Sequence, residues 1–470
     1  MTSRWLIIIV AGGISSSAFA QQTPPIQPKT VDTPKLVPLV VPSLPKGNEI
    51  IANAPLTAVE AVKIALAHQP SVFISKASAD ALKGQRIQTQ SLLNPTVVAG
   101  GSATRNQSFG SSQGGAAGGG TQGGGATAGG SRNETQLSAD VTLNQLIFDF
   151  NKTRDMVRQS QALESAGYKT YDQTLQDVAL QAKQDFYAYV QSRQQTKVQE
   201  ANVKSRQGQV DLTQAEVNAG TGEPSDLVTA KTLLAQGTIT WSQAQQAEAV
   251  AKVKLATDMG IDPRTPVTIA DSAEADVTLP EDANSLVDLA LKQRPTILSA
   301  IDSLKAAGYG VSVARKTNVP TINLQAGFQT SGSPAIFDNP GGFVSLTLNW
   351  TLIDGGFQLG KVQEAEANRT SAAQTLRQVS QNVISDVSNA VAGVQTARQQ
   401  IPIANSEVAD AQEGVRLAEG RYRAGVTTFQ EVITAQAALV QANTDQVNAV
   451  AALAIALATL DHAIGKWPLG

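Results

Sequence analysis

Residues 344–356 read VSLTLNWTLIDGG, and residues 137–149 read LSADVTLNQLIFD. In both stretches apolar residues alternate with Ser, Thr, Asn or Asp until the chain reaches a turn that begins at an aspartate. This alternation predicts β-strands with one apolar and one polar face. A half-buried hairpin of a soluble protein looks the same locally, but polar faces with so few charges favour strands between lipid and a water-filled lumen.

The sequence predicts four such strands, two in each half of the chain. Their approximate bounds are 96–104, 135–148, 321–330 and 343–353. Phe148 and Trp350, near the strand ends, suit the aromatic girdle of a membrane barrel. Four strands cannot close around a lumen, because the smallest single-chain barrels have about eight. A barrel built from these strands must therefore be shared by several chains.

The two quoted stretches belong to a tandem duplication. Asp149 and Gly220 are separated by 71 positions, and Asp354 and Gly425 are separated by the same number. Two pairs of prolines, each 25 positions apart, repeat in the same order: Pro70 with Pro95, and Pro295 with Pro320. Self-similarity of this kind predicts two copies of one structural unit. The predicted repeats are 56–283 and 284–470.

A glycine-rich tract at 110–130 accounts for the 20 extra residues that the first repeat has between Pro95 and Asp149, compared with Pro320 and Asp354 of the second. Its Gly, Ala, Ser, Thr and Gln residues cannot bury a core, so we expect a flexible, exposed loop between two strands on the extracellular side. A phosphate-binding loop is the alternative, but no Gly-Lys-Ser or Gly-Lys-Thr follows the tract.

The first twenty residues have the order of a secretory signal peptide. Arg4 precedes the apolar run 6–10, and Ala18 and Ala20 form a small-residue cleavage site, so we expect cleavage after Ala20 and export of the chain. An uncleaved N-terminal anchor is the alternative, but the apolar run is shorter than the ~20 residues that a membrane-spanning helix needs. A proline-rich segment, 21–55, follows.

Composition narrows the chemistry that the chain can perform. The absence of cysteine excludes disulfides and thiolate metal sites, and the formal net charge of -3 gives no indication of a nucleic-acid partner. The two histidines, His68 and His462, are more simply structural than catalytic. The best later candidate for a membrane-spanning helix, 449–458, is short and rich in alanine, and we expect it to be a packed helix face.

Most of the remaining sequence predicts unusually long helices. Apolar residues recur at spacings of three and four over 171–189 and 376–394, with no proline inside either stretch. The roughly 70 residues after each strand pair would span about 100 Å as one helix, which suits a coiled coil or a helical tube better than a globular domain. We expect the helices to reverse direction at tips near 219–227 and 424–432.

The order and spacing of these parts resemble the TolC family of outer-membrane efflux proteins. Besides the strand ends and tips of both repeats, the resemblance rests on Leu-Thr-x-x-Glu-Ala at 56–61 and on Arg-Tyr-Arg-Ala-Gly at 421–425, followed by Glu-Val at 431–432. It covers the chain from Leu56 to Ile464.

The resemblance implies an α+β membrane fold that is assembled as a homotrimer. Four strands from each chain would form one twelve-stranded outer-membrane β-barrel, continuous with a long periplasmic α-helical barrel, and residues 262–283 with the chain ends would form a belt around it. The implied function is passive conduction in a tripartite efflux or type I secretion system, powered by an inner-membrane transporter through a periplasmic adaptor. Outer-membrane lipid is an implied partner, and no nucleic acid, cofactor, metal or catalytic residue is implied.

The resemblance also places a periplasmic gate at the tips. The family's tip aspartate, which bonds a neighbouring tyrosine, corresponds to Asp226, and that tyrosine corresponds to Tyr422. Thr427 stands where the family has an arginine that ties the constriction together. This link is therefore missing unless Arg421 or Arg423 replaces it.

One acidic ring is expected at the tunnel mouth instead of the two that the family has. Glu431 keeps the negative charge of one ring, whereas the uncharged Thr434 occupies the position of the other ring's acidic residue. Asp226 and Glu431 also lie in the first turn of a helix, where the helix dipole alone favours an acidic residue. The residues expected to contact the adaptor are Gly220, Gly222, Gly425 and Val426.

Other classes of exported protein share some of these features. A periplasmic adaptor also has long helical hairpins, but adaptors usually have one hairpin between β-rich halves, whereas this sequence predicts two equivalent hairpins. A secreted enzyme would need a metal-ligand cluster, a Ser/His/Asp arrangement or a nucleotide-binding motif, and the sequence contains none of these. A purely structural coiled-coil fibre does not account for the alternating strands.

Overall fold

The computed structural model describes residues 55–107, 133–269, 283–332, 336 and 338–467. The predictions for the signal peptide at 1–20, with Ala18 and Ala20, and for the glycine-rich loop at 110–130 lie outside these residues. The proline-rich segment, apart from its last residue, and most of the expected belt at 262–283 also lie outside them.

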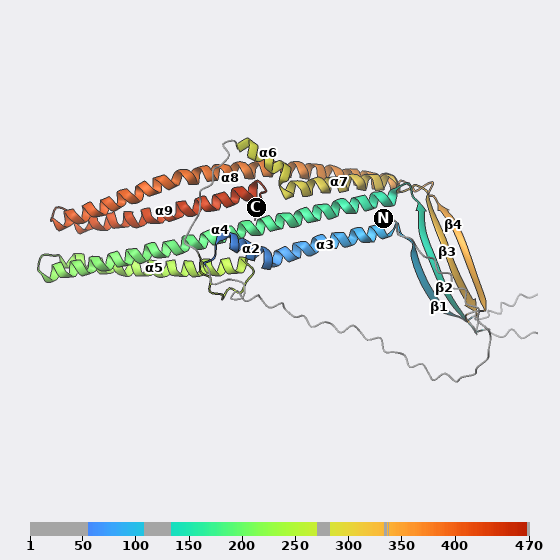
Figure 1. Cartoon of the computed structure of the whole chain (residues 1–470), viewed down its shortest axis with the longest axis horizontal. Coiled ribbons are helices and arrows are strands. Elements are labelled where there is room, and N and C mark those ends of the chain that lie inside the picture. Colours follow the sequence, from blue (N-terminus) through green and yellow to red (C-terminus); the bar gives the residue numbers. More distant parts are fainter. Residues whose placement is uncertain (1–54, 108–132, 270–282, 333–335, 337, 468–470) are drawn as a thin grey trace, which may run out of the picture. The chain divides into compact units, whose positions relative to one another are not determined.

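The same order of elements occurs twice along the described chain, as the duplication predicts (Figure 1). The first repeat contains α2 (Ala58–His68), α3 (Pro70–Ser91), β1 (Thr96–Gln107), β2 (Asn133–Phe148), α4 (Lys152–Asn218) and α5 (Pro224–Asp258). The second contains α6 (Ala283–Gln293), α7 (Pro295–Arg315), β3 (Thr321–Gly332), β4 (Asn339–Asn349), α8 (Phe357–Arg423) and α9 (Phe429–Ala463). The long helices α4 and α8 have 67 residues each, and α5 and α9 have 35 each. At a rise of 1.5 Å per residue, each long helix extends over about 100 Å.

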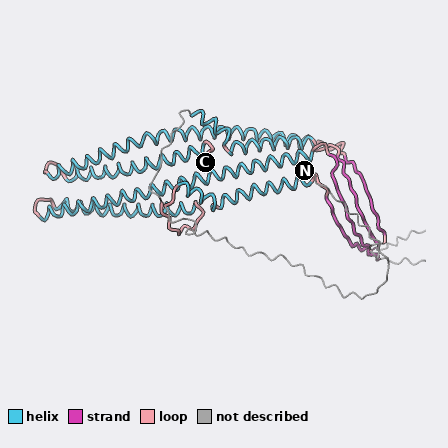
Figure 2. The backbone as a smooth tube through the Cα atoms, viewed as in Figure 1, coloured by secondary structure: helices cyan, strands magenta, loops and turns pink. Residues whose placement is uncertain are grey.

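The four strands form one antiparallel sheet in the order β1-β2-β3-β4 (Figure 2). Their register aligns the apolar residues of successive strands on one face. One row of that face runs across the sheet through Val97, Leu143, Ala326 and Val344. The opposite face is polar, and the hydroxyls of Ser102 and Ser138 lie 2.8 Å apart on it. Leu346, on the apolar face of the sheet, is 68% exposed, so no layer of the described chain covers this face at Leu346.

The fourth strand differs from its predicted bounds of 343–353, because it lies four residues earlier, at Asn339–Asn349. Its partner β3 begins at Thr321, opposite Asn349, directly after Pro320. Proline has no N–H to donate to the ladder, so residues beyond Asn349 have no partner in β3. Ile353 is accordingly 91% exposed. The other three strands agree with the prediction to within three residues at each end.

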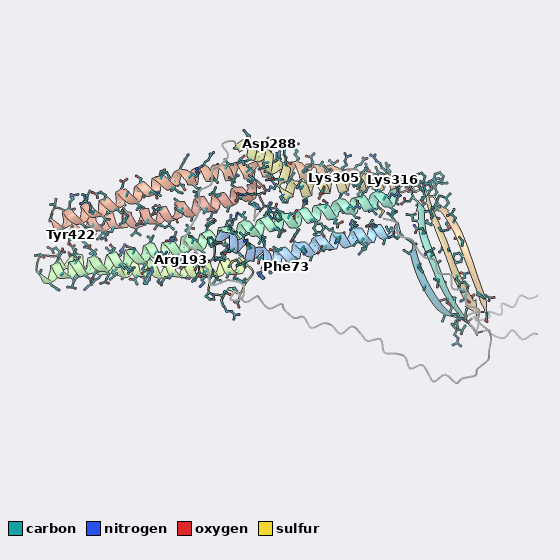
Figure 3. All side chains as sticks on the ribbon, in the orientation of Figure 1. Phe73, Arg193, Asp288, Lys305, Lys316 and Tyr422 are labelled. Atoms are coloured by element: carbon teal, nitrogen blue, oxygen red, sulfur yellow. The ribbon has the colours of Figure 1, made fainter. Side chains whose placement is uncertain are left out.

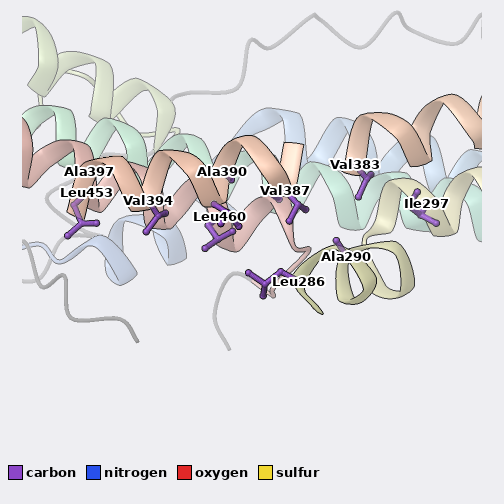
Figure 4. Close-up of a cluster of buried hydrophobic side chains, with 12 residues drawn as sticks. Leu286, Ala290, Ile297, Val383, Val387, Ala390, Val394, Ala397, Leu453 and Leu460 are labelled. Atoms are coloured by element: carbon purple, nitrogen blue, oxygen red, sulfur yellow. The ribbon is translucent and has the colours of Figure 1, made fainter. Parts of the chain in front are cut away.

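Each long helix forms a hairpin with the shorter helix that follows it, since α5 packs beside α4 and α9 beside α8 (Figure 1). α4 also contacts α7 and α9, which joins the first repeat to the second. A buried apolar cluster connects α6, α7, α8 and α9 (Figure 4). Its larger members include Leu286, Ile297, Val383, Val387, Val394, Leu453 and Leu460.

One helix of the described chain, α9, is long and apolar enough to span a membrane by length and composition. The sequence prediction had no such helix, because it considered only uninterrupted apolar runs. Within the stretch 449–458, Leu453 and Ala454 are buried against the neighbouring helices. Asn443 and Asp445 lie on the same helix. The hydropathy of α9 therefore reflects a packed core face, as expected for 449–458.

Candidate functional site

Both hairpins reverse direction through a glycine in the left-handed backbone region. Gly220 has φ +77° after α4, and Gly425 has φ +67° after α8. The Thr221 N–H donates to the Glu216 carbonyl over 3.0 Å, and the equivalent Val426 N–H donates to the Arg421 carbonyl over 2.9 Å. These bonds satisfy carbonyls that the helix end leaves free, so they stop both long helices in the same way. They also fix the backbone of the last helical turn at each tip.

Tyr422, in the last turn of α8, reaches across to the first hairpin (Figure 3). Its hydroxyl donates to Glu216 Oε2 at 3.3 Å and to Asp226 Oδ2 at 3.4 Å. The ring of Tyr422 lies 5.6 Å from that of Phe429, at a tilt of 51°. Phe429 is buried with Val210 and other apolar residues of the two tips. The sequence-predicted pair of Asp226 and Tyr422 is therefore in contact within one chain.

The environment of Tyr422 keeps its phenol protonated. Burial and then the negative charges of Glu216 and Asp226 raise the pKa of Tyr422 to about 12. A phenol with such a pKa is a hydrogen-bond donor throughout the neutral range. The arrangement can hold the two hairpin tips together through a charge-assisted hydrogen bond.

Glu431 belongs to a second contact, which lies within the second hairpin. Arg421 Nη1 donates to Glu431 Oε1 at 2.6 Å, and the Thr427 hydroxyl donates to the other carboxylate oxygen. Arg423 instead pairs with Glu419, at 3.4 Å. The carboxylate expected to form an acidic ring is therefore accompanied by an arginine, and Thr427 contacts it by a hydrogen bond.

The predicted adaptor-contacting residues lie on the turns themselves. Val426 is 69% exposed, and a Cβ atom added at Gly220 or Gly425 would meet nothing within 4 Å. Gly222 differs, because a Cβ there would lie 2.8 Å from the Cβ of Glu216. Three of the four residues thus offer an open surface, whereas Gly222 is required by the packing of the turn.

The sequence prediction missed Glu216. It lies one helical turn before Gly220, and its carboxylate faces the same phenol as Asp226. The duplication contains a signal for it, because positions 216 and 421 are equivalent and both carry a charge. No motif marks the contact, since Glu216 and Tyr422 are 206 positions apart.

The described residues contain no group of three His, Asp or Glu side chains that could hold a metal ion. A cavity of about 830 Å³ lies between α8, α9, Gln191 of α4 and Arg294. Asp386, Asn389, Thr459 and His462 give this cavity a polar part of its wall. His462 is engaged at 2.7 Å by Asp177, which agrees with a structural role.

Comparison with known proteins gives consistent matches in sequence and in fold. The sequence model of outer membrane efflux proteins matches residues 61–260 and 286–466, which divides the chain close to the predicted repeat boundary. Protein CyaE of Bordetella pertussis is 27% identical over 390 residues, which cover 81% of this chain and 78% of CyaE. The pyoverdine export outer membrane protein OpmQ of Pseudomonas putida is 28% identical over 267 residues, 55% of this chain and 56% of OpmQ.

Solved outer-membrane channels share the fold. The CmeC outer membrane channel of Campylobacter jejuni superposes with a TM-score of 0.75 at 16% identity, covering 91% of this chain and 93% of CmeC. These matches support the channel prediction and not the adaptor alternative. Since the family's sequence model matches most of both repeats, the chain belongs to the outer membrane efflux protein family and is an outer-membrane channel with a periplasmic helical barrel.

Proposed function

We propose that three copies of this chain form one channel that conducts exported molecules passively across the outer membrane. An inner-membrane transporter would supply the energy and a periplasmic adaptor would connect the two, so the chain itself would catalyse no reaction. The observation that carries this proposal is the sheet, which is apolar on one face, polar on the other and open at both edges among the described strands. OpmQ, a pyoverdine export protein, supports the same class of transport.

The open edges are the argument for a trimer. Unpaired N–H and C=O groups of β1 and β4 would cost several kcal/mol each in lipid, where no water replaces the missing hydrogen bonds. Val344 and Leu348, 76% and 63% exposed in the single chain, would face lipid once β4 pairs with the β1 strand of a neighbouring copy. Three sheets of four strands would then close one barrel of twelve.

The hairpin tips would form both the adaptor contact and the gate. Gly220, Gly425 and Val426 provide an exposed surface on the turns, and Gly222 keeps one turn tight. The contact of Tyr422 with Asp226 would hold the tips together in the closed state. A hydrogen bond to a charged group contributes about 1.5–3 kcal/mol, so three copies would bias the gate by several times this amount.

The test combines mass measurement with conductance. Native mass spectrometry of the detergent-purified protein should give a trimer, and planar bilayers containing it should show a small single-channel conductance. Changing Tyr422→Phe together with Asp226→Ala removes the donor and one acceptor, and should raise that conductance several-fold. A monodisperse monomer that forms pores would contradict the shared barrel. A double variant that conducts like the parent would show that the Tyr422 contact is only packing.

A further inference from the structure

The duplication places opposite charges at equivalent positions of the two tips. Glu216 and Asp226 of the first hairpin correspond to Arg421 and Glu431 of the second, since 205 positions separate the members of each pair. In the second hairpin, the arginine and the acid form an ion pair at 2.6 Å. The first hairpin has two carboxylates at these places, so it cannot form the same internal pair.

Tyr422 takes the place of the missing cation. Its hydroxyl lies 3.3 Å from Glu216 and 3.4 Å from Asp226, and in the described chain no cationic side chain contacts either carboxylate. Both distances exceed the 2.5–3.0 Å of an ordinary O–H···O bond, as expected when one hydrogen is shared between two acceptors. Both charges also raise the pKa of Tyr422.

The phenol is held in place from its own side. Its ring lies against Phe429, which is 5% exposed and packs with Val210 and Ala230 of the first hairpin. The backbone of Glu216 is also fixed, because its carbonyl accepts the backbone N–H groups of Thr221 and Gly222 at 3.0 Å each. The Tyr422 hydroxyl of the second hairpin and the two carboxylates of the first hairpin are therefore held close to one another.

We propose that Glu216 is a positioning residue of the gate, and that its charge makes the first hairpin depend on Tyr422. Glu216 prevents the first tip from forming an ion pair of its own and supplies the phenol with a second acceptor. Asp226 and Glu216 then share one donor that comes from the other hairpin. This inference rests on the proposed gate, and it adds a residue and a reason for the contact between the hairpins.

The decisive variant is Glu216→Arg, which gives the first hairpin the charge pattern of the second. The introduced guanidinium should pair with Asp226 within the hairpin, so Tyr422 loses Glu216 and competes with the guanidinium for Asp226. The single-channel conductance in planar bilayers should rise above the parent's, towards the level of Tyr422→Phe. Asp211→Arg is the matched control, because Asp211 is exposed on α4 of the same hairpin and its carboxylate contacts Gln207, so this variant makes the same charge change away from the Tyr422 contact. The control should conduct like the parent.

Alanine variants test the sharing of the phenol. Glu216→Ala and Asp226→Ala should each keep one acceptor and raise the conductance less than Tyr422→Phe does, whereas the double variant should match Tyr422→Phe. The Tyr422 pKa, followed by NMR of tyrosine labelled at Cζ, should fall in each single variant and fall further in the double variant. A purely packing role of Glu216 would not move that pKa.

The outcomes separate this inference from the gate itself. If Tyr422→Phe raises the conductance but Glu216→Arg does not, Glu216 has no part in the gate and the inference is wrong, while the gate stands. If Asp226→Ala alone matches Tyr422→Phe, the second acceptor is also refuted. If Tyr422→Phe conducts like the parent, the gate fails and the role of Glu216 fails with it.

Discussion

Asp185 and Asp258 form a carboxylate pair between α4 and α5, and Lys254 contacts both of them. Burial, followed by hydrogen bonding to Asp185 and the charge of Asp185, raises the pKa of Asp258 to about 6. Burial would also raise the pKa of Asp185, but hydrogen bonds with Asp258, Lys254 and Gln181 outweigh it and hold this pKa below its ordinary value. The pair therefore shares one proton in mildly acidic solution.

This pair predicts how stability depends on pH. Because the folded-state pKa of Asp258 lies above the ordinary value of 3.8, the folded chain retains a proton that the unfolded chain releases. Stability from this group should therefore be present at about pH 4 and be lost as pH rises to about 6. Asp258→Asn should remove this loss of stability between pH 4 and pH 6, because asparagine carries no charge at either pH. The melting temperature of the variant should therefore exceed the parent's at pH 7, and the gap between the two melting temperatures should shrink towards pH 4.

The control for this prediction is Asp410→Asn, which changes an exposed carboxylate on α8. Asp410→Asn should leave the difference in melting temperature between pH 4 and pH 7 the same as in the parent. Equal pH profiles for the parent and Asp258→Asn would show that Lys254 neutralises both carboxylates, so that no proton is shared.

The ion pair of Arg421 with Glu431 changes the expectation for ion selectivity. In a trimer the ring of Glu431 would carry three carboxylates beside the three guanidinium groups of Arg421, so the fields of these two sets of groups largely cancel. Arg421→Gln should leave Glu431 unpaired and increase cation selectivity, whereas Glu431→Gln should shift selectivity towards anions. Reversal potentials in a salt gradient measure both effects, and high ionic strength should reduce them.

Glu413 and Arg416 provide a matched pair for this experiment, since they lie 2.6 Å apart on α8, away from the turn. Glu413→Gln and Arg416→Gln should leave the reversal potential unchanged. Selectivity that responds equally to both pairs would place the selective region along the helices, and the role of Glu431 at the mouth would be wrong.

At the scale of the elements, the strand-to-helix turns show how different residues give one geometry. Asp149 Oδ2 accepts the Thr153 N–H at 2.6 Å, and Asp354 Oδ2 accepts the Gln358 N–H at 2.7 Å. The two residues that follow each aspartate have positive φ in both repeats. They are Phe150 and Asn151 in the first repeat and Gly355 and Gly356 in the second. The aspartate therefore sets the turn, because it satisfies the same backbone donor in both repeats.

The helix-to-helix turn at Gly425 has a strict conformational requirement. Its φ of +67° is strained for a residue with a Cβ, although nothing lies within 4 Å of that position. Gly425→Ala should therefore destabilise the tip by about 1 kcal/mol through backbone strain alone. Hydrogen exchange of residues 421–431 should become several-fold faster.

Gly420 is the matched control, because it lies within α8 and also has open space around it. Gly420→Ala should leave the exchange of the tip unchanged or slow it, since alanine favours the helix. If both variants exchange alike, the left-handed turn is not what limits the opening of this tip.

At the scale of the whole molecule, the duplication provides two similar hairpins with different chemistry. The helices of the two hairpins have equal lengths, α4 matching α8 and α5 matching α9. The same number of helical residues therefore separates each tip from the strands. The two tips differ in charge at equivalent positions, because Arg421 pairs with Glu431 in the second hairpin whereas Glu216 stands at the place of the arginine in the first. We infer that the duplicated copies diverged in charge while their backbone remained the same.

The sequence by itself determined the elements and their order. Strand alternation, helical spacing and the turn glycines are local signals, since each depends on residues within a few positions of one another. These signals located both tips and three of the four strands to within a few residues. They failed at β4, where the end of the strand depends on where Pro320 lets its partner begin.

Only the tertiary structure decided which side chains meet. Tyr422 contacts Glu216 and Asp226 across 206 and 196 positions of sequence, and no periodicity specifies such a distance. The resemblance to a family suggested the contact with Asp226, but the contact with Glu216 depends on how the two hairpins pack side by side. Local sequence sets the path of the backbone, whereas the packing of one hairpin against the other sets which charged and polar groups meet at the tips.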